Sequence, residues 1–202
     1  MQAYQEIKLF PSEDIPCHFL WEKLFQQVHL ALVENKYVTS NSKNGSDRIV
    51  EYSEYGVSFP QYDTQLNALG CRLRVFASNE KKLKQLDLIR WIDRLQDYCL
   101  CTSIEPVPQN IKYARFIRRQ FRTNIERMAR RRAKRQQETY EQALAYYKGF
   151  NDQLTRLPYI FMNSLSGKQR FPLFIQKEMT EAEERGEFSC YGLSKTATVP
   201  WF

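Results

Sequence analysis

The chain has 202 residues, of which 43% are hydrophobic and 14% aromatic, and 30 Lys and Arg stand against 23 Asp and Glu, a formal net charge of +7. A chain of this length and apolar content can bury a substantial core, which excludes an intrinsically disordered protein. No run approaches the roughly 18 apolar residues of a membrane span, and the N-terminal segment is charged, so we expect neither export nor a spanning helix but a cytoplasmic protein.

The first half of the chain alternates between strand-like and helix-like patterns. In order, the sequence predicts a strand over 4–10, a helix over 16–34, strand-like pieces around 48–52 and 56–59 that count as one strand, a strand over 71–77, a helix over 79–97 and a strand over 98–103. The polar segment 36–46, rich in Asn, Ser and Lys, is expected to be a loop.

This order of elements indicates an α+β fold. The succession β-α-β-β-α-β is that of the ferredoxin-like unit, whose helices cover one side of an antiparallel sheet. The open face or the edges of such a sheet often contact RNA. Pro106 and Pro108 mark a linker, which predicts a ferredoxin-like domain over 1–105 and a C-terminal α+β domain over 106–202.

The second half is expected to begin with an extended segment over 112–119 and to continue with a basic helix over about 124–148. Three further strands are predicted by alternation, over 159–163, 170–176 and 187–193.

The positive charge of the chain is concentrated in one window. Residues 118–135 hold nine Lys or Arg, eight of them Arg, and one acid, Glu126, which leaves 21 basic and 22 acidic residues elsewhere. Thr123 and Glu126 have capping-box spacing, which predicts a helix start near Asn124. Five cations then share one helical face by their spacing: Arg127, Arg130, Arg131, Lys134 and Arg135.

Such a face repels itself unless an anion neutralises it. A polyphosphate groove does so by exchanging its counterions for the side chains, and Arg suits bidentate phosphate contacts. A solvated charged face is the alternative, although such faces usually interleave both signs. A helix on an anionic membrane needs bulky apolar residues, and the opposite side of this helix carries little beyond Ile125 and Met128. The window therefore favours nucleic acid and no membrane.

Candidate metal ligands are few and scattered. The five cysteines form an odd set that we interpret as free thiols. His18 and His29, the two histidines, stand eleven residues apart without Cys or carboxylates at ligand spacing, which predicts no structural zinc and no catalytic metal. The signatures of serine hydrolases, nucleotide hydrolases and dinucleotide-binding enzymes are absent. No cofactor is expected.

Metal-free RNA cleavage needs little beyond one neutral imidazole. With a pKa near about 6.5, the ring can remove the proton of a 2′-hydroxyl, whose oxygen then attacks the adjacent phosphorus. The products are a 2′,3′-cyclic phosphate and a free 5′-hydroxyl, and DNA lacks the nucleophile. The alternative for His18 and His29 alike is a structural histidine of a helix.

Four spaced motifs carry a resemblance to a known family. In order they are GVSFP at 56–60, RRQFRTNIER at 118–127, LPY at 157–159 with FPLFI at 171–175, and FSCYGLSK at 188–195 with VPWF at 199–202. Together they resemble the CRISPR repeat-processing endoribonuclease of the type I-F (Csy-type) system, and the resemblance spans nearly the whole chain.

The resemblance implies three active-site residues. His29, on the first predicted helix, matches the catalytic base of the family. Ser164 matches an active-site serine that would hold the ribose and its 2′-hydroxyl, with Ser166 as the alternative. Tyr191 resembles an active-site tyrosine that would orient the imidazole or contact the region of the scissile phosphate.

The resemblance also implies the RNA-binding residues. Arg118 and Gln120 look like a pair that hydrogen-bonds base edges at the foot of a hairpin stem, and Phe171 would stack on the terminal base pair. Side chains cannot normally read the deep, narrow major groove of A-form RNA, so we expect the basic helix to contact phosphates. Its residues are those of the basic face: Arg127, Arg130, Arg131, Lys134 and Arg135.

The implied function is that of a metal-independent, hairpin-specific endoribonuclease that makes mature guide RNAs from precursor RNA. The resemblance further implies that it stays on its product within the interference complex, beside other protein subunits, and we expect a monomer as the free enzyme. One alternative is a non-catalytic RNA-hairpin-binding subunit with an idle His29. Another is a DNA-binding module, which would bind duplex DNA equally well.

Overall fold

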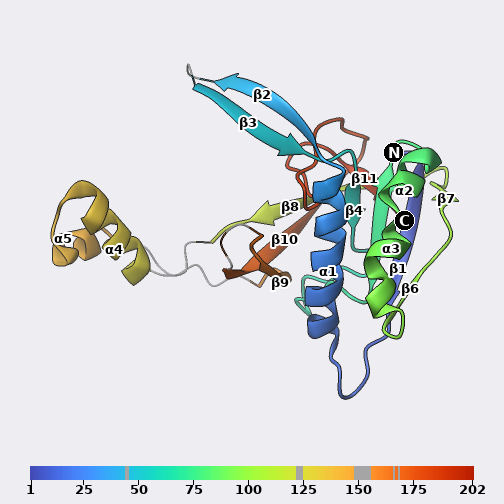
Figure 1. Ribbon diagram of the computed structural model, residues 1–202, viewed down its shortest axis with the longest axis horizontal. Coiled ribbons are helices and arrows are strands. Elements are labelled where there is room, and N and C mark those ends of the chain that lie inside the picture. Colours follow the sequence, from blue (N-terminus) through green and yellow to red (C-terminus); the bar gives the residue numbers. More distant parts are fainter. Residues whose placement is uncertain (44–45, 122–124, 148–155, 166, 168) are drawn as a thin grey trace. The chain divides into compact units, whose positions relative to one another are not determined.

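The computed structural model describes residues 1–43, 46–121, 125–147, 156–165, 167 and 169–202. It divides into two compact units, a larger one of residues 1–119 and 157–202 and a smaller one of residues 120–156 (Figure 1). The predicted α+β class is confirmed. The elements of the larger unit are β1 (Ala3–Leu9), α1 (Cys17–Glu34), β2 (Tyr37–Lys43), β3 (Ser46–Tyr52), β4 (Gly56–Ser58), β5 (Arg72–Ala77), α2 (Glu80–Leu86), α3 (Leu88–Ile92), η1 (Asp93–Leu95), β6 (Cys99–Cys101), β7 (Glu105–Pro106), β8 (Lys112–Arg119), β9 (Tyr159–Asn163), β10 (Arg170–Thr180) and β11 (Val199–Trp201).

The first sheet has the strand order β4-β5-β1-β6. Strand β6 pairs with the C-terminal part of β1, and β7 pairs with its N-terminal part on the same edge. All pairings are antiparallel, with Ile7 of β1 opposite Leu73 of β5 and Cys101 of β6. Helices α1, α2 and α3 pack on this sheet, because their apolar side chains join those of the strands in one buried core. Burial of these side chains is the main stabilising contribution to the unit.

The second sheet has the order β11-β8-β10-β9, again antiparallel. Its core is continuous with that of the first sheet. The ring of Phe116 on β8 lies 5.5 Å from Phe59 and 6.0 Å from both Tyr62 and Trp201, measured between centroids. The chain after residue 106 therefore returns to the same core, and the predicted division at 105/106 differs from the two units of the structure.

The prediction that the segment 36–46 forms a loop is wrong. It forms strand β2, which pairs antiparallel with β3 in a hairpin of its own (Figure 1). The rings of Tyr37 and Tyr52 lie across from each other at its base, 6.0 Å apart. Its polar residues hide the pairing, since they lack the apolar alternation that predicts a strand, whereas the pairing itself is made by backbone groups.

Two further elements differ from prediction. The expected helix over 79–97 breaks at Asp87, whose φ of 48° is left-handed, so that α2, α3 and η1 follow one another. The expected strand over 187–193 is instead a turn, in which Gly192 has a φ of 68° and its N–H donates to the Ser189 carbonyl at 2.8 Å. A left-handed glycine ends an extended strand, whatever the alternation of its neighbours.

The smaller unit contains α4 (Ile125–Gln136) and α5 (Tyr140–Tyr146) where one helix over about 124–148 was expected. Gln137 has a φ of 54°, and the Glu138 N–H donates to the Ala133 carbonyl at 3.3 Å, which is the bond that closes a Schellman C-terminus. Thr139 and Gln142 then form a capping box that starts α5. Thr123 and Asn124, at the predicted start, lie outside the described residues.

The two helices of the smaller unit are held together by Arg132. Its Nε lies 2.6 Å from Glu138 Oε1, and its guanidinium carbon lies 3.7 Å from the ring centroid of Tyr146. Both ionic groups are largely buried, so this pair contributes more than an exposed one would. Arg132 is thereby turned toward α5.

Two expectations from composition concern the whole chain. The five cysteines all have free thiols, as predicted. Over the described ranges, the structure contains no helix with both the length and the apolar character needed to cross a membrane.

The turn at Gly192 leads to a prediction about stability. A Cβ at this position would lie 2.5 Å from Val57 Cγ1, and the left-handed backbone disfavours any L side chain. We expect Gly192→Ala to lower the free energy of unfolding by about 2 kcal/mol in urea denaturation. Gly167→Ala is the control, since its Cβ would meet only Ser164 Oγ at 3.5 Å. Equal midpoints for the two variants would contradict the assignment of strain to Gly192.

Candidate functional site

His29 lies in the C-terminal half of α1 and is buried, with 7% of its surface exposed. Its Nδ1 is 2.8 Å from the carbonyl oxygen of Cys190. A carbonyl oxygen only accepts, so the neutral ring carries its proton on Nδ1 and donates it to this bond. Nε2 is then left with a lone pair, as a general base requires.

The His29 ring stacks on a second predicted site residue. Its centroid lies 4.2 Å from that of Tyr191, and the two planes are inclined by 9°. The turn at Gly192 presents Tyr191 at this place, because the Val57 N–H of β4 donates to the Gly192 carbonyl at 2.9 Å and anchors the turn to the first sheet. The Tyr191 ring therefore fixes the orientation of the imidazole.

Arg118, at the end of β8, continues the row of side chains. Its guanidinium carbon lies 5.1 Å from the ring centroid of Tyr191 and 5.3 Å from that of Phe171 on β10. Both distances are within the range of cation–π attraction. Four of the predicted residues, His29, Tyr191, Arg118 and Phe171, are thus brought together from four separate parts of the chain.

The electrostatics of this row favour a neutral imidazole. Burial lowers the pKa of His29 below its ordinary value of 6.5, the Arg118 charge lowers it further, and the hydrogen bond to Cys190 opposes both. Burial raises the pKa of the Tyr191 phenol, with Arg118 acting in the opposite direction. At neutral pH, the His29 imidazole is therefore neutral, with its single proton on Nδ1, and the Tyr191 phenol keeps its proton.

Ser164 is the first residue after β9 and opens the turn that leads to β10. Its N–H donates to the Gln169 carbonyl at 2.9 Å, and its Oγ accepts from the Gly167 N–H at 3.1 Å. These bonds close the turn and fix the direction of the hydroxyl. Ser166, the alternative serine, lies outside the described residues.

Two polar side chains of α1, which the sequence interpretation missed, hold this turn. Gln26 Oε1 accepts from the Asn163 N–H at 3.1 Å, and Glu22 Oε2 pairs with Arg170 Nη2 at 2.8 Å. With His29, they stand at i, i+4 and i+7 on one helix face. This spacing was the available signal, and it links both ends of the turn that carries Ser164 to the helix that carries His29.

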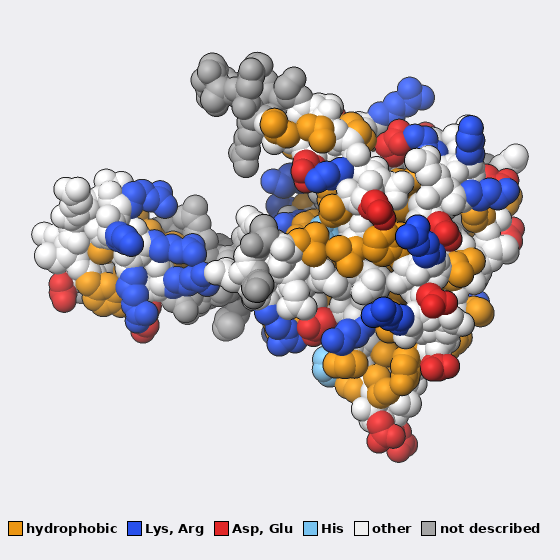
Figure 2. Space-filling model, viewed as in Figure 1, with side chains coloured by type: hydrophobic (Ala, Val, Ile, Leu, Met, Phe, Trp, Pro, Cys, Tyr) orange, Lys and Arg blue, Asp and Glu red, His pale blue; other side chains and the backbone are white. Residues whose placement is uncertain are grey.

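The other predicted residues belong to the smaller unit, which Gln120 begins. The five cations predicted to share one face of α4 are all exposed: Arg127, Arg130, Arg131, Lys134 and Arg135. Figure 2 shows Lys and Arg side chains gathered over α4 and α5. A groove of about 440 Å³ runs beside them, lined by Met128, Arg131, Arg132, Arg135, Gln136 and Tyr147.

Glu126, the single acid of the basic window, does not neutralise this surface. Its Oε2 lies 3.4 Å from Arg130 Nη2, and both side chains are about 70% exposed, at 69% and 71%. An exposed i, i+4 pair of this kind contributes only a few tenths of a kcal/mol. Arg130 therefore remains available to an incoming anion.

Groups that could bind a metal were also predicted to be absent, and the structural finding concerns only the described part of the chain. This part contains no group of three or more His, Cys, Asp or Glu side chains arranged so that they could hold a metal ion.

Comparison with known proteins places the chain in a family. Residues 4–202 match the sequence model of the family described as CRISPR-associated protein (Cas_Csy4). Over their full lengths, the chain is 36% identical to a protein of Escherichia coli (strain UTI89 / UPEC) and 35% identical to one of Pseudomonas aeruginosa (strain UCBPP-PA14). Both relatives are named CRISPR-associated endonuclease Cas6/Csy4. The chain belongs to the Csy4 family of CRISPR-associated proteins.

The electrostatic assignment of His29 can be measured directly. In wild type, we expect NMR titration of the ¹³C-labelled imidazole to give His29 a pKa below 6.5. Arg118→Gln removes a nearby positive charge and should raise this pKa, whereas Arg185→Gln, at an exposed site, should leave it unchanged. A pKa that falls or stays the same in Arg118→Gln would contradict the interaction.

Proposed function

We propose that this protein is an endoribonuclease that cleaves CRISPR repeat hairpins in precursor RNA and so produces mature guide RNAs. Its membership of the Csy4 family and the endonuclease names of its two relatives support this function. The observation that carries the proposal is the state of His29, a buried neutral imidazole whose Nδ1 is engaged by Cys190 and whose Nε2 is left as the base.

The proposed reaction is independent of metal. His29 Nε2 takes the proton of a 2′-hydroxyl, and the 2′-oxygen attacks the adjacent phosphorus. The bond from phosphorus to the 5′-oxygen breaks, and this oxygen leaves with the proton of the imidazolium, passed to it directly or through a water. The products are a 2′,3′-cyclic phosphate and a free 5′-hydroxyl, and the histidine is again neutral.

We assign supporting roles to two further residues. The Ser164 hydroxyl, directed by the Gly167 N–H, holds the ribose so that its 2′-oxygen faces His29. Tyr191 keeps the imidazole in place through the stacked contact at 4.2 Å and stays a neutral phenol. Holding the reacting groups in this way supplies part of the rate by proximity and orientation.

Recognition of the hairpin is assigned to both units. Arg118 and Gln120 read base edges at the foot of the stem, and Phe171, already beside the Arg118 guanidinium, stacks on the terminal base pair. The phosphates of the stem are contacted by the basic face of α4: Arg127, Arg130, Arg131, Lys134 and Arg135. Their exposure and the groove beside them support this role.

The architecture proposed for the N-terminal part is ferredoxin-like, with α4 as the arginine-rich helix of the C-terminal part. The order β4-β5-β1-β6 in an antiparallel sheet, with helices between its first and second and its third and fourth strands in sequence, supports this class. We also propose that the free enzyme is a cytoplasmic monomer that keeps its product hairpin and joins other subunits of the type I-F interference complex.

Cleavage assays test the mechanism. In excess EDTA, wild type should cleave an end-labelled repeat hairpin and leave a copy with one 2′-deoxy nucleotide upstream of the cut intact. His29→Ala should lose at least about 100-fold in cleavage rate, the usual contribution of a general base, and keep its affinity for the hairpin. His18→Ala, at an exposed position, is the control and should cleave normally.

Three outcomes would overturn the proposal. If His29→Ala lost affinity as severely as cleavage, His29 would be structural. If wild type and variant bound tightly without cleaving, the protein would be a non-catalytic hairpin-binding subunit. Equal competition by a DNA hairpin would indicate a DNA-binding module instead.

The basic face makes a separate prediction about salt. Neutralising a phosphate releases counterions, so each lost contact reduces the slope of log K against log salt by about one. Arg130→Ala and Arg131→Ala should each weaken hairpin binding and flatten this slope by that amount, measured by fluorescence anisotropy. Lys81→Ala, at an exposed position of α2, should leave the slope unchanged, and an unchanged slope in the α4 variants would remove them from the RNA contact.

A further inference from the structure

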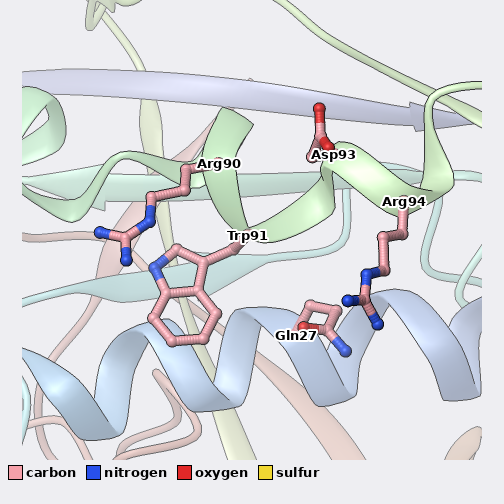
Figure 3. A pocket seen from close by; sticks show the side chains of 5 residues that line it. All are labelled: Gln27, Arg90, Trp91, Asp93 and Arg94. Carbon is pink, nitrogen blue, oxygen red and sulfur yellow. The ribbon is translucent and has the colours of Figure 1, made fainter.

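A second pocket lies on the larger unit between α1 and the segment formed by α3 and η1 (Figure 3). Its cavity volume is about 270 Å³, and we call it the Trp91 pocket after the aromatic residue in its wall. It is lined by Gln27, Arg90, Trp91, Asp93 and Arg94. Gln27 and His29 are two residues apart on α1, which turns their side chains to roughly opposite sides of the helix. The pocket is therefore separate from the site of His29.

The two arginines of the pocket present unneutralised charge. Arg90 and Arg94 are exposed and four residues apart, and within the described part of the chain neither forms an ion pair or a side-chain hydrogen bond. Asp93 is the acid nearest to them in sequence. Its carboxylate points away from α1 (Figure 3) and accepts a hydrogen bond from Gln96 Nε2. The arginines are thus free to bind an anion.

Trp91 gives the pocket a flat apolar wall. The side chain is half-buried against the core, and its indole ring lies between the Arg90 guanidinium and α1 (Figure 3). The volume is slightly below the range of about 300–1,000 Å³ typical of drug-sized ligands, which suits a single planar group. Gln27 lines the pocket from α1 on the side of Arg94 (Figure 3) and carries an amide that can both donate to and accept from the edge of such a group.

The surface continues along α1 with the same chemistry. Lys23 and Phe19 lie one and two turns before Gln27 on the same helix face, and Phe19 is 47% exposed. The Lys23 ammonium lies 5.2 Å from the centroid of the Phe19 ring. A cation and an aromatic ring are therefore repeated beside the Trp91 pocket.

We propose that the Trp91 pocket and this stretch of α1 bind single-stranded RNA. One base stacks on Trp91, its edge meets the Gln27 amide, and the flanking phosphates pair with Arg90 and Arg94. Interleaved aromatic rings and cations are the usual platform for single strands, since every base has a face to stack and every nucleotide a phosphate. An acidic peptide would use the cations but would leave the Trp91 and Phe19 rings without a partner.

The source of the strand rests on the proposed function. A precursor RNA that contains repeat hairpins also contains unpaired nucleotides outside them, and these would supply the single strand. Binding of an unstructured oligonucleotide is nevertheless independent of hairpin cleavage, so the two proposals can fail separately.

The test uses the full-length protein and a labelled oligouridylate of roughly 12 nucleotides, which forms no hairpin. Trp91→Ala and the double variant Arg90→Ala/Arg94→Ala should each weaken its binding about tenfold in fluorescence anisotropy, the expected loss for one stacked base or two phosphate contacts. The control Lys81→Ala/Arg185→Ala removes two exposed positive charges elsewhere and should bind as wild type does. Circular dichroism and the urea midpoint verify that each variant is folded.

Tryptophan fluorescence locates the contact. Wild type should be quenched by the oligouridylate, whereas Trp91→Phe, which keeps a ring for stacking, should bind it and lose most of the quenching. The other two tryptophans are Trp21, which is buried, and Trp201 of β11, and they serve as the unquenched background.

Several results would overturn the proposal. Equal oligouridylate affinity in all variants, or quenching that persists in Trp91→Phe, would place the single strand elsewhere. Binding of oligoglutamate, but not of oligouridylate, that is lost in Arg90→Ala/Arg94→Ala would make the pocket a protein-docking surface.

If wild type bound oligouridylate through the pocket but left the repeat hairpin uncut, the proposed function would fail and the pocket would stand.

Discussion

The candidate active site depends on one hydrogen bond, between His29 Nδ1 and the Cys190 carbonyl, which joins residues 161 positions apart in the chain. This bond decides which ring nitrogen carries the proton, and so which one can accept another. Because the acceptor is a main-chain group, no side-chain substitution at Cys190 removes it directly. Its position is set by the backbone of the turn, and the turn in turn requires Gly192 with its positive φ. The imidazole of His29 on α1 is thus oriented by a turn from the far end of the sequence.

The charges around His29 differ in character from the cations of α4. At His29, one positive charge and burial act together on a single titrating group, and the effect is local because the surroundings are poor in water. On α4, the cations are exposed, and the interactions of exposed charges are screened by salt. Arg118 belongs to the first kind although it lies in the same basic stretch of the sequence as the cations of α4. Its placement between two aromatic rings explains the difference.

Strongly periodic segments could be predicted from the sequence, because burial on one face imposes a period. The strands β1, β5, β8 and β9 and the helix α1 follow this rule. Strand β2 escaped prediction, although a strand was expected around 48–52 in its partner β3, because the sequence of β2 is almost entirely polar and its pairing is made by backbone groups. At 187–193 the alternation was present but one left-handed glycine outweighed it. The two compact units of the structure do not follow the linker prolines, as Phe116 packs against Phe59, which is distant in sequence and invisible to local patterns.

The residues of the candidate site were predicted from family motifs rather than from periodicity. His29, Ser164 and Tyr191 were named because short motifs resemble those of a family, not because local chemistry singled them out. The partners that shape their chemistry could not be found like this. The Cys190 carbonyl has no side-chain signature, and Gln26 and Glu22 are ordinary polar residues of an amphipathic helix until the end of β9 is folded against them.

The left-handed break at Gln137 has a consequence for the size of the nucleic-acid footprint. It limits α4 to 12 residues, a rod of about 18 Å, where an unbroken helix to residue 148 would have been nearly twice as long. A rod of this length can follow only a handful of phosphates along one strand before the groove curves away from it. Under the proposed function, base pairs of the stem beyond the reach of Lys134 and Arg135 therefore add nothing to binding. Hairpins that share a foot and differ only in loop or upper stem would be held alike.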